Sequence, residues 1–378
     1  MKKALVHDWY YVNGGAEKVV KSLNSIWSDF DHFALVDFLT DEDRQYLLNG
    51  DRVNTSFIQK LPTSRKGHQK FLQLFPYAIE QFDLSEYDLV LSSSASVAKG
   101  VLTNHQQLHI CYCHSPMRYA WDLYHQYLED SGLRNGIKGL YAKYVLHKIR
   151  NWDYSSSNRV DLFIANSEYV ASRIRKTYNR EACVIYPPVD TKNFSLEKNK
   201  DEYFFTASRL VPYKKTEIII KAFNQMPEKK LLVAGYGPDY KRLKKLAKSN
   251  VKLLGFISDD YMKDCLQKAK AFVYAAEEDF GIVPVEAQAC GTPVICFSKG
   301  GLMETVINNE TGLYFHEQST KAIIKAVENF EQIRFDAEII RKNSQRFGVE
   351  RFENEIKEYV ESKFEVFRSK KHVDNQNF

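Results

Sequence analysis

Short apolar runs of strand length alternate along the chain with longer stretches in which apolar residues recur at helical spacing. In the first half, the strand-like runs occupy residues 4–6, 32–36, 88–91, 108–112 and 160–165. Nearly continuous apolar strands separated by helices are typical of a parallel sheet that helices cover on both faces. The pattern therefore predicts an α/β fold, in which ligands bind beyond the carboxyl ends of the strands.

The pattern breaks near the middle of the chain and then begins again. Residues 183–190 change from apolar to Pro-Pro-Val-Asp, and charged residues follow as far as Glu202, which is typical of an inter-domain linker. With 378 residues, the chain exceeds one hydrophobic core of ordinary size. We therefore predict one domain over residues 1–190, a second over 191–345, and a helical, charged segment over 346–378.

Two glutamates flank a predicted helix N-terminus in the second half. They are Glu278 and Glu286, and Pro284 suits the first turn of the helix between them. Amides at a helix N-terminus can receive an anion. Here these amides belong to Phe280, Gly281, Ile282 and Val283. The arrangement suits a phosphate-linked sugar, with carboxylates for hydroxyls and amides for phosphate. By itself, however, the spacing is more often that of a solvated helix face.

Basic residues follow the strand pattern that opens the second half. Arg209 and Lys214 enter the loop between this strand and a helix, where they can clamp a diphosphate. Gly235 ends the next strand, in a turn that lets the backbone approach a nucleotide. Scattered basic residues are usually solvated surface, and only their place at a strand end favours a clamp.

Two candidate positions lie in the first half. Gly14 and Gly15 join a strand to a helix, which makes a loop for a phosphate or a plain turn. His114 follows a strand in the run Cys-Tyr-Cys-His. Zinc would need a second pair of ligands, and the sequence offers none at a suitable spacing. A structural histidine is the other interpretation.

Acidic pairs elsewhere do not predict a metal site. Asp41-Glu-Asp43 follows Thr40, and Asp259-Asp260 follows Ser258, so both pairs fit the first turn of a helix, where the dipole favours acids. We therefore expect no bound metal and no cofactor. The six cysteines are scattered through mostly apolar runs, which favours reduced core residues over disulfides.

Together these motifs resemble the retaining nucleotide-sugar glycosyltransferases of family 4, and most of all their bacterial O-antigen and capsule mannosyltransferases. The resemblance rests on Glu-x7-Glu with Phe-Gly after the first acid and Ala-x-Ala-x-Gly-x-Pro-Val after the second, and on His7-Asp-Trp and Pro187-Pro-Val-Asp. It implies the GT-B fold, with two Rossmann-like, doubly wound parallel-sheet domains facing across a cleft. It also implies that the helix in residues 346–378 packs back on the first domain and ends in a basic tail.

The resemblance assigns roles to the candidate residues. Arg209 and Lys214 would bind the donor diphosphate, and Glu278 and His114 would hold the sugar from opposite domains. The remaining donor-binding positions are Gly14, Gly15, Gly235, Phe280, Gly281, Ile282, Val283 and Glu286, the last of which would hold the ribose hydroxyls. One departure is Lys215, where the family commonly has glycine, so Lys215 is an alternative to Lys214 as the closer contact.

The implied reaction moves a hexose, with retention, from a nucleoside diphosphate sugar to a lipid-linked oligosaccharide in O-antigen, capsule or exopolysaccharide synthesis. The resemblance favours mannose from GDP-mannose. A UDP-sugar donor is the first alternative. Others are a sugar-nucleotide epimerase, a catalytically silent nucleotide-sugar-binding module of the same fold, and a phosphate-binding scaffold at membranes.

Composition and charge indicate where in the cell the protein is expected. The chain is 44% hydrophobic and 27% charged, and lacks a signal peptide pattern, so we expect a cytoplasmic protein. A formal charge of +5 is too small to imply nucleic acid. Residues 65–75 and 131–152 interleave basic with large apolar residues, and the second segment has no acid. Both predict peripheral binding to the anionic inner face of the plasma membrane; for 131–152 the alternative is a core-facing helix with a solvated basic face.

Overall fold

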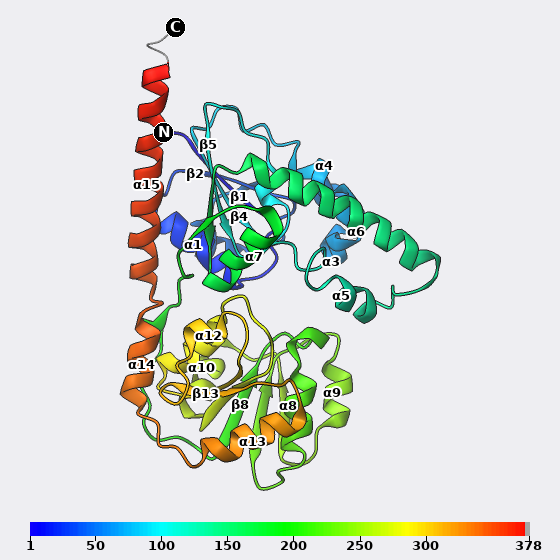
Figure 1. The fold of residues 1–378 in the computed structure, drawn as a ribbon, viewed down its shortest axis with the longest axis vertical. Helices are drawn as coiled ribbons and strands as arrows, with labels where there is room; N and C mark the ends of the chain where they lie inside the picture. Colours follow the sequence, from blue (N-terminus) through cyan, green and yellow to red (C-terminus); the bar gives the residue numbers. More distant parts are fainter. Residues whose placement is uncertain (375–378) are drawn as a thin grey trace. The chain divides into compact units, whose positions relative to one another are not determined.

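The computed structural model describes residues 1–374 and divides into two compact units. The first comprises Met1–Pro188 and Phe352–Phe378, and the second comprises Val189–Arg351 (Figure 1). The last four residues of the expected basic tail lie outside the described residues. None of the helices within residues 1–374 combines the length and the hydropathy needed to span a bilayer.

The first unit is built on a seven-stranded parallel sheet with the order β3-β2-β1-β4-β5-β6-β7. Its strands are β1 Lys3–His7, β2 Phe30–Ala34, β3 Val53–Thr55, β4 Leu89–Ser94, β5 Leu108–Cys113, β6 Leu162–Ala165 and β7 Ala182–Val184. The chain winds outward from β1 to β3 and then in the opposite direction from β4 to β7. The order therefore reverses between β1 and β4, which is where ligands bind in such sheets.

Helices cover both faces of this sheet because its strands are apolar on both sides. Leu5 of β1 packs in one core with residues of α1, α2 and α15, whereas Ala4 and Val6 pack in another with residues of α4 and α6. The helices and 3-10 turns are α1 Gly15–Ile26, α2 Asp41–Leu48, η1 Phe57–Lys60, α3 Ser64–Gly67, η2 His68–Leu74, α4 Phe75–Ile79, η3 Ala98–Gly100, α5 Tyr124–Asp130, α6 Gly136–Ser156, η4 Ser157–Arg159, α7 Glu168–Tyr178 and α15 Val349–Asp374.

The second unit repeats this plan with a six-stranded parallel sheet in the order β10-β9-β8-β11-β12-β13. Its strands are β8 Tyr203–Ala207, β9 Lys230–Ala234, β10 Val251–Gly255, β11 Ala271–Tyr274, β12 Val294–Phe297 and β13 Gly312–Phe315. The order reverses between β8 and β11. Two parallel sheets, each wound in both directions, confirm the predicted fold class.

The helices of the second unit also pack on both faces of its sheet. Phe204 lies in the core formed with α8, α9 and α13, and Phe205 in the core formed with α10, α11 and α12. The elements are η5 Thr191–Asn193, η6 Pro212–Lys214, α8 Thr216–Phe223, α9 Tyr240–Leu246, α10 Asp259–Lys268, α11 Ile282–Ala289, α12 Leu302–Thr305, α13 Thr320–Phe330 and α14 Ala337–Gln345.

The acidic pairs lie where the capping argument predicts. The Thr40 side chain accepts a hydrogen bond from the Asp43 amide, and Ser258 accepts one from the Tyr261 amide, so the acids occupy the first turns of α2 and α10. The charged segment that ends at Glu202, which the sequence predicts to be part of an inter-domain linker, packs on the second unit through Lys200. Lys200 donates to the Gln267 and Cys290 carbonyls and to Thr292, and burial lowers its pKa to about 8.

Candidate functional site

The predicted site residues of the second unit lie at the carboxyl ends of β8, β9 and β11. Arg209 and Lys214 follow β8, Gly235 follows β9, and Glu278 follows β11. Strands β8 and β11 are hydrogen-bonded neighbours, and the winding of the sheet reverses between them. The fold therefore brings two loops that are about 60 residues apart in sequence to the edge where parallel sheets bind ligands.

Lys214, Glu278 and Tyr274 form one hydrogen-bonded group at this edge. The Lys214 ammonium donates to Oε1 of Glu278, and the Tyr274 hydroxyl donates to the same oxygen over 2.6 Å. Burial lowers the pKa of Lys214, but the Glu278 carboxylate and the hydroxyls of Tyr274 and Tyr213 together outweigh burial, so the pKa lies above the usual value. Burial and the same carboxylate also raise the pKa of Tyr274. The group therefore presents a positive charge beside a carboxylate, with side chains 17% and 16% exposed.

Two further basic residues follow β8 outside this group: Arg209, which is more exposed, and Lys215, which has an unusual backbone conformation. The Arg209 side chain is exposed and forms no ion pair within residues 1–374. Lys215 has a φ of 56° and precedes α8. This left-handed conformation favours glycine, which accounts physically for the glycine expected after the lysine. In the structure it is Lys214, not Lys215, that contacts Glu278.

Glycines hold the loop of Glu278 in place. Gly281 has a φ of 93° and is the N-cap of α11, which no side chain caps. Gly300 lies against the loop, since a Cβ there would overlap the Glu278 carbonyl oxygen. Gly235 allows the turn after β9 to lie against the chain that follows β8, because a Cβ at this position would overlap the carbonyl oxygen of Ser208.

The predicted donor-binding segment forms the start of α11. Phe280 is buried and packs on Phe347 with 5.3 Å between ring centroids, while Ile282 and Val283 begin the helix. Glu286 is only 7% exposed. The interpretation of the two glutamates as a solvated helix face is therefore wrong. Both side chains are largely buried in the second unit. Glu278 precedes the N-terminus of α11, which carries a partial positive charge, and Glu286 lies within the helix.

In the first unit, His114 follows β5 and is half-buried. Its Nε2 lies 2.8 Å from Oγ of Ser93, a residue of the neighbouring strand β4. Burial lowers the pKa of His114 to about 3, with a smaller contribution from His7. The ring is therefore neutral at physiological pH, so it can bind a polar oxygen but cannot act as a fixed cation.

A second histidine in this unit was missed from the sequence as a site residue. Nδ1 of His7 lies 3.1 Å from both the carbonyl oxygen and Oγ of Ser93, and Nε2 lies 3.7 Å from Glu17. Burial lowers the pKa of His7, but the hydrogen bond and charge of Glu17, together with Asp8 and the Ser93 carbonyl, outweigh burial and raise the pKa overall. Glu17, His7, Ser93 and His114 thus form a polar chain where the winding reverses between β1 and β4. The sequence feature that could have indicated this group is Glu17, an acid in the first turn of the helix that begins at the glycine pair.

The glycine pair makes room for this chain. Gly14 is the N-cap of α1, and a Cβ there would lie 2.7 Å from Oε2 of Glu17. Gly15 begins the helix. Within residues 1–374, no three His, Cys, Asp or Glu side chains gather as metal ligands do.

Two family models match consecutive parts of the chain. Residues 13–193 match Glycosyltransferase Family 4, and residues 189–347 match Glycosyl transferases group 1. Each model therefore covers most of one unit.

Curated relatives are similar over part of the chain. An uncharacterized glycosyltransferase of Methanocaldococcus jannaschii is 29% identical over 58% of this chain and 62% of its own length. The GDP-mannose-dependent monoacylated alpha-(1-6)-phosphatidylinositol monomannoside mannosyltransferase of Corynebacterium glutamicum is 33% identical over 39% and 47%. The O-antigen chain mannosyltransferase RfbU of Salmonella typhimurium is 31% identical over 43% and 49%. The chain thus matches between about half and three-fifths of these relatives' length.

Solved structures are similar over nearly the whole chain. HepE of Anabaena, in complex with UDP and glucose, has a TM-score of 0.69 at 20% identity and covers 96% of this chain and 100% of its own. Sucrose-phosphate synthase from Thermosynechococcus elongatus has a TM-score of 0.74 at 18% identity and covers 97% and 100%. These likenesses show the GT-B fold. With a glycosyltransferase model matched in each unit, the chain belongs to the family 4 glycosyltransferases.

Proposed function

We propose that the protein transfers a hexose from a nucleoside diphosphate sugar to a hydroxyl of a lipid-linked glycan, with retention and without a metal ion. The observation that carries the proposal is the group of Lys214, Glu278 and Tyr274 beside the uncapped N-terminus of α11. An ammonium ion and helix amides suit a diphosphate, and a carboxylate suits sugar hydroxyls.

The chemistry follows from where charge develops. When the bond between the sugar and the diphosphate breaks, its electron pair goes to the departing phosphate oxygen. Lys214, Arg209 and the amides of α11 would stabilise this charge, while Glu278 holds a hydroxyl of the sugar. The proton of the acceptor hydroxyl would go to the departing phosphate. We assign no covalent nucleophile, and His114 remains a predicted contact of the donor sugar.

For the donor we propose GDP-mannose. Support comes from two relatives, one named as GDP-mannose-dependent and the other as an O-antigen mannosyltransferase, each matched over less than half of its length. A UDP-sugar is the competing donor. Thermal shift against GDP-mannose, GDP-fucose, UDP-glucose and UDP-galactose, followed by turnover of whichever stabilises most, decides between them.

Turnover in matched variants tests the site itself. Glu278→Gln should nearly abolish sugar transfer, whereas Glu277→Gln should not, because Glu277 pairs with Lys299 instead, over 2.9 Å. A Glu278→Gln protein with full activity would remove the proposed site. Donor binding without turnover by the native protein would favour the silent binding module. A loss of activity in EDTA that manganese restores would refute transfer without a metal.

We also propose a peripheral position on the inner face of the plasma membrane. Ile137 and Leu140, in the first turns of α6, are 89% and 71% exposed, with basic residues between and around them. The alternative of a core-facing helix fits only the second half of α6, where Leu146 and Ile149 are buried. Segment 65–75 contributes basic residues alone, because its apolar side chains turn toward the core. Flotation with phosphatidylglycerol vesicles, against neutral vesicles, tests the position.

A further inference from the structure

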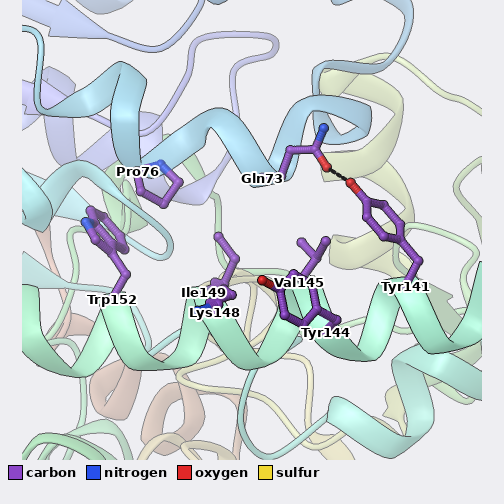
Figure 2. Close-up of a pocket in the computed structure, with 8 residues that line it drawn as sticks. All are labelled: Gln73, Pro76, Tyr141, Tyr144, Val145, Lys148, Ile149 and Trp152. Carbon is purple, nitrogen blue, oxygen red and sulfur yellow. Dashed lines mark hydrogen bonds between the residues drawn. The ribbon is translucent and has the colours of Figure 1, made fainter.

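A cavity of about 330 Å³ lies between α6 and the segment that joins η2 to α4. Figure 2 shows side chains of α6 on one side, with Gln73 and Pro76 facing them from the other. The lining residues are Gln73, Pro76, Tyr141, Tyr144, Val145, Lys148, Ile149 and Trp152. Most of them are apolar or aromatic, and the volume is at the lower end of the range for small-molecule sites.

The cavity follows the helix as a groove. Its lining on α6 runs from Tyr141 to Trp152, which corresponds to roughly 16 Å along the axis at about 1.5 Å per residue. At one end the Trp152 indole donates to Glu80 over 2.8 Å, which fixes the end of the groove. At the other end the Tyr141 hydroxyl donates to Oε1 of Gln73, and both of these residues are exposed. A mostly apolar groove of this volume and length, with a polar, exposed end, suits a single hydrocarbon chain.

The positive charge of Lys148 indicates which kind of hydrocarbon chain the groove would bind. Lys148 lines the groove, is exposed, and lies 5.7 Å from the centre of the Tyr144 ring. It forms no ion pair with any residue that the structure describes, and segment 131–152 contains no acid. An anionic group at the end of the chain would therefore meet a cation that no carboxylate of this helix neutralises.

We propose that this groove binds the hydrocarbon chain of the lipid-linked acceptor and that Lys148 pairs with the phosphate of that lipid. The inference rests on the proposed function, since it identifies the acceptor as a phosphate-linked lipid. Bulk phospholipid is the less suitable occupant. Exposed Ile137 and Leu140 suffice for adsorption to a bilayer, which needs neither a groove nor a lysine in the lining of one.

The test uses geranyl phosphate, a single-chain isoprenyl phosphate, titrated into the full-length protein below the concentration at which it aggregates. Native protein should bind it saturably. Val145→Trp, which fills the groove, should weaken binding about tenfold, as expected when two methylene groups lose their burial. Lys148→Glu should weaken binding about threefold or more but leave the binding of geraniol, which lacks the phosphate, unchanged.

Leu140→Ser is the matched control, because Leu140 lies on the same helix outside the groove. It should reduce binding to phosphatidylglycerol vesicles and leave the affinity for geranyl phosphate unchanged. Thermal melting verifies that Val145→Trp is folded, and Lys148→Glu, at an exposed position, provides an independent test if it is not. A photoactivatable geranyl phosphate should label α6 and η2.

Two results would overturn the proposal: no saturable binding of geranyl phosphate, or weaker binding in Leu140→Ser with no change in Val145→Trp and Lys148→Glu. Turnover of the donor separates this failure from failure of the proposed function. If the native protein transfers a hexose but does not bind geranyl phosphate, the groove is not the acceptor site. If it binds geranyl phosphate but turns over no nucleotide sugar, the enzymatic function is wrong and the groove holds some other phosphorylated lipid.

Discussion

The ion pair between Lys214 and Glu278 predicts that stability and turnover respond differently to the same pair of substitutions. Removing one partner of a fully buried pair costs about 3–5 kcal/mol, because the other charge is left without compensation. These side chains are 17% and 16% exposed, so water recovers part of that cost. We expect Lys214→Met to lower the free energy of unfolding by about 1–3 kcal/mol.

Adding Glu278→Gln to Lys214→Met removes the uncompensated carboxylate. The double variant should therefore be more stable than Lys214→Met by about 1–2 kcal/mol, a coupling of the size measured for residues in contact. Turnover should behave in the opposite way. Loss of the ammonium should reduce kcat about 10²–10³-fold, as loss of one oxyanion-hole donor does, and the second substitution cannot restore it.

Urea unfolding followed by far-ultraviolet circular dichroism measures the first effect, since all four tryptophans lie in the first unit and do not report on the second unit. Steady-state transfer from the best donor measures the second effect. Glu277→Gln serves as control in both, since that residue pairs with Lys299. Equal stability of the single and double variants would show that the pair does not form. Recovery of kcat in the double variant would show that Lys214 acts only by supporting the fold.

Three further predictions concern other parts of the structure. Asp153→Asn should lower the free energy of unfolding in guanidinium by about 3–5 kcal/mol, because it leaves the buried ammonium of Lys99 without its partner. Gly300→Ala should lower both Tm and sugar transfer, since its Cβ would overlap a backbone carbonyl oxygen of the facing loop. Gly132, with a φ of 65°, has open space around it, so Gly132→Ala should lower the free energy of unfolding by only about 1 kcal/mol. The folded state lowers the pKa of His114 from 6.5 to about 3, so the contribution of neutral His114 to stability is present above pH 6.5 and is lost as pH falls toward 3. His114→Asn should therefore reduce proton uptake on acid unfolding by about one proton. An unchanged pH dependence of stability would refute this.

The sheets were predictable because strands buried on both faces produce continuous apolar runs. The reversal of winding was implied by the family resemblance, since alternating strands and helices also form barrels. The strand predicted at 32–36 is observed as Phe30–Ala34, two residues earlier. Such shifts are expected, since apolar residues continue beyond the last hydrogen bond of a strand. The position of the loops that carry the candidate site residues was predictable because carboxyl ends of parallel strands converge on one edge.

Contacts between side chains were less predictable. The sequence placed Lys214 on the diphosphate and Glu278 on the sugar as separate groups, whereas they are hydrogen-bonded to each other. The strand pattern brings the two loops to the same edge of the sheet, but it does not encode which of their side chains bond to each other. His7 was missed for a similar reason: its role depends on Ser93 across the sheet and on Glu17 in the following helix.

The chain of Glu17, His7, Ser93 and His114 connects His114 to a buried histidine and a carboxylate of the same unit. Nδ1 of His7 contacts the carbonyl oxygen of Ser93, which can only accept, so this nitrogen carries a proton. Oγ of Ser93 lies within hydrogen-bond distance of the same nitrogen and of Nε2 of His114. If the Ser93 hydroxyl donates to Nε2, neutral His114 carries its proton on Nδ1. A neutral ring suits a hydroxyl oxygen of a sugar, whereas stabilising the charge of a diphosphate requires fixed cations, the role proposed above for Lys214 and Arg209.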